Sequence, residues 1–217
     1  RLDGDSGDQS GTSVSSAGDF NGDGISDLII GAYRDNSDTG VSYIVYGKEA
    51  NDPFPSFSNL STLDGTNGFK LVGINLADAS GRSVSNAGDI NNDGINDIIV
   101  GAPGYPSGTN GGKIYIYSGS DGTEIRTVAP VGLTGYGYSV AGLGDITGDG
   151  KPDYAVGAPY ESSAYGAVYV YSGTGALLYD LGGTYANNFF GGSLAGKVDL
   201  NGDGLNDLIV GTAAYDP

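Results

Sequence analysis

The chain has 217 residues, including 41 glycines and 16 tyrosines, and it lacks cysteine, methionine, tryptophan and histidine. This composition excludes disulfides, thiolate or imidazole metal sites, and catalysis that depends on histidine or cysteine. The formal net charge of −17 argues against binding to nucleic acid or anionic membranes and favours cations as partners. No apolar run reaches the roughly 18 residues that a membrane-spanning helix needs. Because the sequence begins at Arg1 without a signal-like segment, we expect a processed or excised piece of a longer product.

One acidic phrase recurs along the chain. It reads GDFNGDGISDLIIGA at 18–32, GDINNDGINDIIVGA at 88–102, GDITGDGKPDYAVGA at 144–158 and VDLNGDGLNDLIVGT at 198–212. Recurrence of a whole phrase indicates a repeat architecture. The number of residues from the start of one copy to the start of the next is typical of four-stranded propeller blades.

Each repeat predicts strands in the same order. Small residues around a central Val or Leu predict inner strands near a ring axis at 12–18, 82–88, 138–144 and 192–198. β-Branched runs closed by Gly predict buried second strands at 27–33, 97–103, 153–159 and 207–213. Third strands, with Val or Ile on one face and Tyr on the other, are expected at 41–47, 113–119 and 167–173. Weaker patterns indicate outer, fourth strands at 69–74, 124–130 and 176–182.

These strands predict an all-β partial propeller over residues 1–217, with about 3.5 blades of four antiparallel strands. The repeat units are expected at approximately 10–75, 80–130, 136–183 and 190–217, the last of them incomplete. The stretch 47–68 is rich in turn-forming residues and is interpreted as an insertion in the first unit.

Each acidic loop carries side-chain oxygens at positions 1, 3, 5 and 9, a Gly at position 6 and a backbone carbonyl at position 7. Oxygen ligands on alternate residues of a flexible loop are typical of calcium sites and suit magnesium less well. The third site is expected to bind more loosely, because it has a threonine at position 3. Up to four Ca²⁺ ions are expected, and their predicted ligands are Asp19, Asn21, Asp23, Ile25 and Asp27; Asp89, Asn91, Asp93, Ile95 and Asp97; Asp145, Thr147, Asp149, Lys151 and Asp153; and Asp199, Asn201, Asp203, Leu205 and Asp207, where Ile25, Ile95, Lys151 and Leu205 act through their carbonyls.

Two other interpretations of these loops can be compared with a calcium site. An EF-hand needs an acid at position 12, which here is always apolar: Ile30, Val100, Val156 and Val210. Hairpin turns with solvated acids are the alternative, although turns alone do not require acids at positions 1 and 9 in every copy. Carboxylates about 4 Å apart repel by roughly 1 kcal/mol per pair in water, and a bound cation would offset this repulsion.

The chain resembles the FG-GAP repeats of integrin alpha-subunit propellers and their bacterial and fungal relatives. The resemblance rests on the acidic loops, on the pairs Ser10-Gly11, Ser80-Gly81, Tyr136-Gly137 and Phe190-Gly191, and on the endings Gly101-Ala102-Pro103 and Gly157-Ala158-Pro159. The first and last units depart from it, with GAY at 31–33 and GTA at 211–213. The resemblance implies a seven-bladed extracellular propeller with calcium in the loop between strands 1 and 2. This chain is about half of that length.

The resemblance also implies that partners bind on the face opposite the calcium loops. The predicted contacts on that face are Tyr33, Arg34, Asp35, Tyr105, Tyr160, Glu161 and Tyr165, with ordinary exposed loop residues as the alternative. The expected function is a non-catalytic, secreted or cell-surface module for adhesion or for protein or glycan recognition. The alternatives are the propeller portion of a polysaccharide-acting enzyme and a purely architectural segment of a surface protein. Neither nucleic acid binding nor membrane insertion is expected, and an open ring would favour self-association or pairing with another chain.

Overall fold

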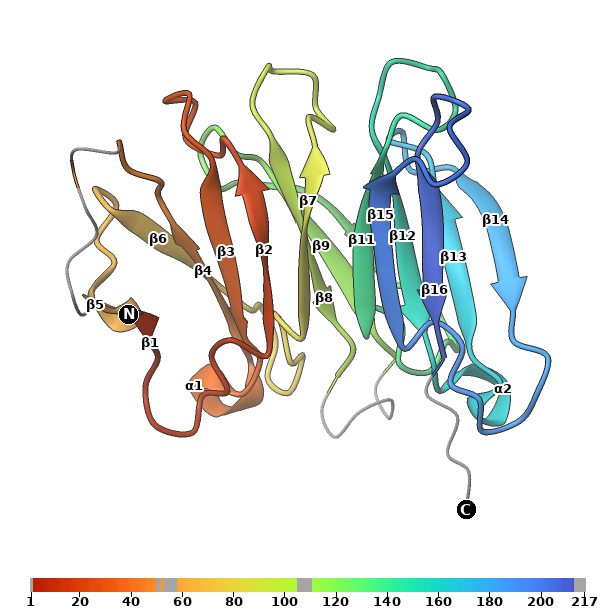
Figure 1. Cartoon of the computed structure of the whole chain (residues 1–217). Coiled ribbons are helices and arrows are strands. Elements are labelled where there is room, and N and C mark those ends of the chain that lie inside the picture. The colour runs from red at the N-terminus through yellow and green to blue at the C-terminus, as the bar shows by residue number, and fades with distance from the viewer. Residues whose placement is uncertain (1, 50–51, 53–57, 105–110, 213–217) are drawn as a thin grey trace.

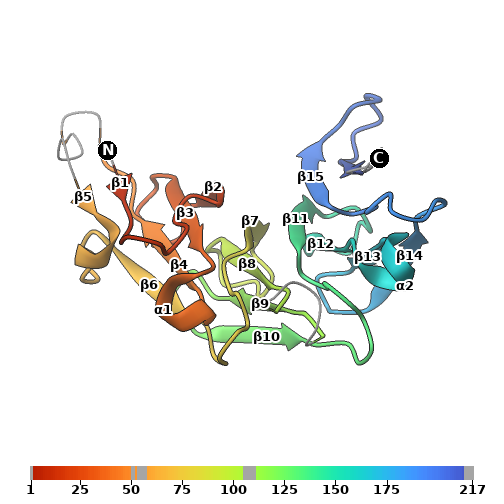
Figure 2. The same ribbon diagram turned by 90° about the horizontal axis from the view of Figure 1, so that it is seen from below.

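The computed structural model describes residues 2–49, 52, 58–104 and 111–212, and it shows β-sheets arranged side by side in an arc (Figures 1 and 2). Three sheets have four strands each, and the last has two. The first sheet contains β2 (Ser13–Gly18), β3 (Asp27–Ala32), β4 (Val41–Val45) and β6 (Gly68–Val72). The second contains β7 (Ser83–Gly88), β8 (Asp97–Ala102), β9 (Lys113–Tyr117) and β10 (Glu124–Val128). The third contains β11 (Ser139–Gly144), β12 (Asp153–Ala158), β13 (Ala167–Tyr171) and β14 (Leu177–Gly182), and the last contains β15 (Ser193–Val198) and β16 (Asp207–Gly211).

Neighbouring strands within these sheets pair antiparallel, in the order in which they follow one another in each repeat. The innermost strands, β2, β7, β11 and β15, lie next to one another on the concave side of the arc (Figure 2). The outer strands β6, β10 and β14 lie on the convex side. This arrangement confirms the predicted partial β-propeller.

The strands follow the predicted burial pattern. All six residues of β8 and all six of β12 are buried, and so are all five of β4 and of β13. In β9 and β13, Val or Ile lies on one face and Tyr on the other, as predicted, whereas in β4 Tyr43 shares a face with Val41 and Val45. One core cluster joins Ile99 and Ile116 of the second sheet to Tyr154 and Val156 of the third. Burial of this apolar surface between sheets, at roughly 25 cal/mol per Å², is what holds adjacent blades together.

Glycine explains how closely the blades approach. The Gly81 N–H donates to the Gly101 carbonyl of the same blade at 3.1 Å, and the Gly137 N–H does so to Gly157 at 3.1 Å. A side chain at Gly101 would collide with the carbonyl oxygen of Gly137 in the next blade. The Gly that precedes each inner strand therefore packs on a Gly near the end of a second strand. This close contact explains why glycine recurs both in the pairs before the inner strands and in the endings of the second strands.

The start of the chain pairs with part of the insertion at 47–68. There, β1 (Leu2–Asp3) pairs in parallel with β5 (Ser58–Asn59), and the short helix η1 (Leu60–Thr62) follows. Leu60 is buried against the first sheet, and Leu2 packs on the same cluster. The sequence pattern predicted an insertion here but not this pairing.

Two short turns, α1 (Asp35–Asp38) and α2 (Glu161–Ala164), connect second to third strands. Both contain left-handed residues: φ is 51° at Asn36 and 60° at Ser37, and 51° at Ser162 and 61° at Ser163.

Among the described residues, no helix is long and apolar enough to cross a membrane.

Candidate functional site

The four acidic loops lie together at one edge of the arc, which we call the acidic edge: 19–27, 89–97, 145–153 and 199–207. Each joins an inner strand to the second strand of the same sheet (Figure 1). The glycine at position 6 has a left-handed backbone in every loop, with φ of 86–88° at Gly24, Gly94, Gly150 and Gly204. A side chain at that position would be strained, so the loops share one sharp turn.

The aspartate at position 9 closes the loop. Asp27 Oδ2 accepts hydrogen bonds from the backbone N–H groups of Phe20 at 2.8 Å and Asn21 at 3.2 Å. Asp27 Oδ1 accepts from the Gly47 N–H, just beyond the third strand, at 2.7 Å. This carboxylate therefore ties the start of the loop to a different strand. Burial raises the pKa of Asp27, while these three amides act in the opposite direction.

The second and third loops repeat this arrangement. Asp97 accepts from Ile90 and Asn91 at 2.7 and 3.2 Å, and from Gly119 at 3.0 Å. In the third loop, Asp153 accepts from Ile146 at 2.9 Å, Thr147 at 3.0 Å and Gly173 at 2.9 Å. The Gly173 carbonyl in turn accepts from Arg126 Nη1 of the second sheet at 3.1 Å. Asp97 and Asp153 are both 0% exposed.

The aspartates at positions 1 and 5 lie at the more exposed rim of each loop. Asp19 Oδ2 accepts from the Gly24 N–H at 2.9 Å, and Asp23 Oδ1 accepts from the Ile25 N–H at 2.8 Å. The same bond from the position-6 amide lowers the pKa of Asp145 and of Asp199. The Ile95 N–H likewise lowers the pKa of Asp93. The lowered pKa of Asp93, Asp145 and Asp199 favours their charged form, which is the form that binds a cation.

The first loop has an oxygen atom that fits a cation. Asp19 Oδ1 is buried and has no hydrogen-bond partner among the described residues. Such an atom pays a desolvation penalty that a bound metal would remove. The other candidate metal ligands in the loop, Asn21 Oδ1 and the Asp23 carboxylate, are also oxygens, as calcium prefers. The residues present therefore fit Ca²⁺.

The side chains do not form a cage of acids alone. Within the described part of the chain, no three acidic side chains converge closely enough to hold a metal. The position-9 aspartate Asp27 instead turns inward onto backbone amides. An ionised carboxylate has about four acceptor positions, and Asp27 uses three of them, so one is left for a cation.

The third and fourth loops differ from the first two. Thr147 Oγ1 donates to Asp145 Oδ1 at 3.3 Å, where the first loop has an amide oxygen at the same position. In the fourth loop, Asp207 is only half-buried, and its Oδ2 accepts a hydrogen bond from the Leu200 N–H at 2.7 Å.

The loops that join second to third strands lie at the opposite edge, together with those that follow the fourth strands (Figure 1). We call residues 33–40, 73–82, 129–138, 159–166 and 183–192 the turn edge. Three of the predicted contacts make ion pairs or hydrogen bonds there. Arg34 pairs with Asp38 at 3.2 Å, Asp35 Oδ2 accepts from the Tyr43 hydroxyl at 2.5 Å, and Glu161 Oε2 accepts from the Thr134 N–H at 2.9 Å. Tyr165 is exposed, and Tyr105 lies outside the described residues.

An aromatic row crosses the turn edge and includes two more of the predicted contacts. The Arg82 guanidinium lies 5.6 Å from the ring centre of Tyr33 and 4.1 Å from that of Tyr138. Tyr160 packs edge-on between Tyr138 at 5.4 Å and Phe189 at 5.7 Å. The row therefore links four successive blades. Sequence reasoning missed Arg82, Tyr138 and Phe189, although the shared place of Arg82 and Tyr138 directly before an inner strand was a usable signal.

Comparison with known proteins identifies similar sequences. The FG-GAP repeat profile matches residues 10–45, 80–117 and 136–171. Integrin alpha-6 from Gallus gallus is 40% identical over 154 residues, which cover 64% of this chain and 14% of that protein. Integrin alpha-5 from Xenopus laevis is 32% identical over 219 residues, which cover 92% of this chain and 19% of that protein. The chain thus spans less than a fifth of the length of these relatives.

Proposed function

This chain belongs to the FG-GAP repeat family, and from that premise we propose that it is a non-catalytic, calcium-binding propeller module that acts in adhesion outside the cell. The observation that supports it best is the acidic loop itself, built four times with one backbone geometry. Its position-1 oxygen in the first loop, Asp19 Oδ1, is buried and has no hydrogen-bond partner among the described residues.

Calcium in these loops would act on stability. The ion supplies positive charge that offsets the clustered carboxylates. In the first loop, Asp19, Asn21 and Asp23 would hold the ion through side-chain oxygens, and Ile25 would hold it through its carbonyl. Asp27 keeps the loop closed through the hydrogen bonds that it accepts from backbone N–H groups. Four such ions would bring the formal charge from −17 to −9.

A calcium titration tests this proposal. Protein treated with a chelator should melt at a lower temperature than the same protein in calcium. A free calcium concentration of 100 times the Kd of one site stabilises the folded state by about 2.7 kcal/mol. Replacing Asp19 and Asp23 with Asn should reduce that gain. Asp64→Asn, a change in an exposed turn outside the loops, should leave it intact. A melting curve that calcium does not move would contradict the structural role of the ion.

The turn edge is the proposed recognition face. Leu76, Val131 and Tyr185 are exposed there, on loops that follow fourth strands. Left-handed residues inside α1 and α2 cost roughly 1–2 kcal/mol each, and such strain is typically kept at functional sites. Exposed apolar side chains beside an aromatic row with a central arginine have the composition of protein interfaces. We therefore favour a protein partner over a glycan.

Binding to panels of immobilised extracellular proteins and glycans would test this face. A variant with Leu76, Val131 and Tyr185 all changed to Asp should lose binding without losing the calcium-dependent gain in melting temperature. Leu177→Asp, an exposed position on the outer strand β14, should retain binding. Selective binding to glycans, or binding that survives the triple change, would contradict the proposed protein-binding face.

A further inference from the structure

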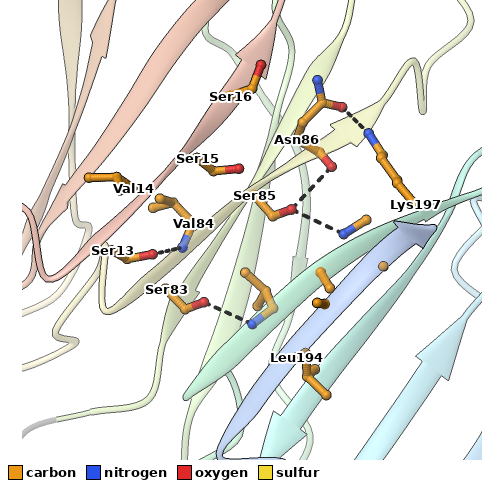
Figure 3. A pocket seen from close by; sticks show the side chains of 15 residues that line it. Ser13, Val14, Ser15, Ser16, Ser83, Val84, Ser85, Asn86, Leu194 and Lys197 are labelled. Carbon is orange, nitrogen blue, oxygen red and sulfur yellow. Dashed lines mark hydrogen bonds between the residues drawn. The ribbon is translucent and has the colours of Figure 1, made fainter. Parts of the chain in front are cut away.

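The concave side of the arc contains a groove that belongs to neither edge. It has a volume of about 470 Å³ and is lined by the inner strands of all four blades (Figure 3). None of its 15 lining residues is acidic, although the chain carries 26 acids. The groove therefore differs in charge from the rest of this strongly acidic molecule.

Serine side chains along the groove join neighbouring blades. Ser13 Oγ accepts from the Val84 N–H at 3.0 Å, and Ser83 Oγ accepts from the Val140 N–H at 3.0 Å (Figure 3). A serine oxygen that accepts in this way still has its hydroxyl hydrogen to donate. The wall of the groove thus offers hydrogen-bond donors.

Lys197 adds a positive charge to this wall. In the first three blades, the equivalent residues are Ala17, Ala87 and Leu143, all buried and apolar. The left-handed residue there is the following glycine, with φ of 71° at Gly144. In the fourth blade, the left-handed residue is Lys197 itself, with φ of 60°, at an irregularity in the pairing between Ala195 and Val198. A shift of this kind redirects a side chain.

The redirected side chain extends across the groove. It passes over Gly142 of the third blade, and its Nζ donates to Asn86 Oδ1 of the second blade at 2.5 Å (Figure 3). Lys48 and Lys113 each have a carboxylate partner within 3.0 Å, whereas no carboxylate pairs with Lys197 in the described part of the chain. An ammonium group has three donors, so Lys197 has two left for a ligand.

We propose that the inner groove binds a carboxylate carried by a hydroxylated ligand, that is, a uronic acid sugar. The carboxylate pairs with Lys197, and the sugar hydroxyls meet Asn86 and the serine hydroxyls of the groove. Recognition combines one charge-assisted bond, which is stronger than a neutral one, with several neutral bonds. The negative charge of the whole molecule acts against an anion, so binding is weak and becomes weaker as salt competes for Lys197.

Titration with glucuronate, followed by NMR of the lysine side chains, tests this proposal. Glucuronate should shift the Lys197 Cε resonance until it saturates, whereas glucose should leave it in place. Lys197→Gln should weaken binding about tenfold or more, because a hydrogen bond to a charged group is lost. Lys70→Gln, on the outer strand β6, removes the same charge elsewhere and should leave binding unchanged.

A second variant protects the test from a folding defect. Lys197→Gly removes the ammonium group and also relieves the left-handed strain, so this protein should fold at least as well as the wild type and still fail to bind glucuronate. Equal affinity for glucose and glucuronate, or full binding by either Lys197 variant, would overturn the proposal. Because the groove is separate from both edges, that result would leave calcium binding and the recognition face untouched.

Discussion

The second and fourth acidic loops share a sequence pattern but differ in how they are anchored. Asp97 is fully buried and holds three backbone amides, one of them from Gly119 beyond the third strand of its sheet. Asp207 occupies the same position in the fourth loop, is half-buried, and holds the Leu200 amide. The turn is thus specified within the loop, whereas its anchoring depends on a strand that comes later in the blade.

The largest expected effect tests that difference. Asp97→Ala leaves three backbone N–H groups without an acceptor, two of them buried, and it should lower the free energy of unfolding by about 3–5 kcal/mol. Within the described residues, Asp207→Ala removes one hydrogen bond, from the Leu200 N–H, at a half-buried site, and it should cost about 1 kcal/mol. Urea denaturation in chelator measures both variants without any contribution from an ion.

Asp121→Ala is the matched control for these two variants. Asp121 accepts local bonds from Thr123 in an exposed turn, so its removal should change the free energy of unfolding far less than Asp97→Ala does. If Asp97→Ala and Asp207→Ala were equally destabilising in chelator, anchoring by the third strand would not distinguish the two loops.

A medium effect is expected where the blades differ in their left-handed residue. Gly144→Ala puts a side chain at φ of 71° and against the Asn206 amide, so it should destabilise by about 1–2 kcal/mol. Lys197→Gly, at the corresponding bend of the fourth blade, should have the opposite sign. Thermal melting of the two variants compares them directly. A loss of stability in both would mean that the bend of the fourth blade is not strained.

The smallest effect concerns calcium affinity in the third loop. Thr147→Asn gives this loop the amide oxygen that the others have, and it should raise the affinity of the site a few-fold. Asn91→Thr makes the reverse change in the second loop and should lower affinity by a similar factor. Competition with a chromophoric calcium chelator measures both. Affinities that do not respond to either exchange would show that position 3 is not a ligand.

The strands and loops of this chain could be predicted because their signals are local. The β-branched run within 97–103 predicted β8, which spans Asp97–Ala102. The turn at Gly94 followed from its place in the acidic phrase. Repetition strengthened each of these predictions, since every blade offered the same pattern again.

Other features depend on contacts between distant segments and carried no local signal. The pairing of β1 with β5 involves two residues on each side, too few to show a period. The position of Lys197 in the groove depends on a one-residue displacement of the left-handed bend. Asp97 was predicted as a metal ligand from its oxygen atoms, but its bond to Gly119 could be seen only once the third strand was in place.

One glycine in the third blade is bonded on both sides. The Gly173 N–H donates to Asp153 of its own blade, and the Gly173 carbonyl accepts from Arg126 of the blade before it. Loosening the second blade would therefore free the carbonyl side of the residue that anchors the third loop. Because each blade contacts only its neighbours, a change that destabilises one blade lowers the stability of the adjacent blade before it affects more distant ones.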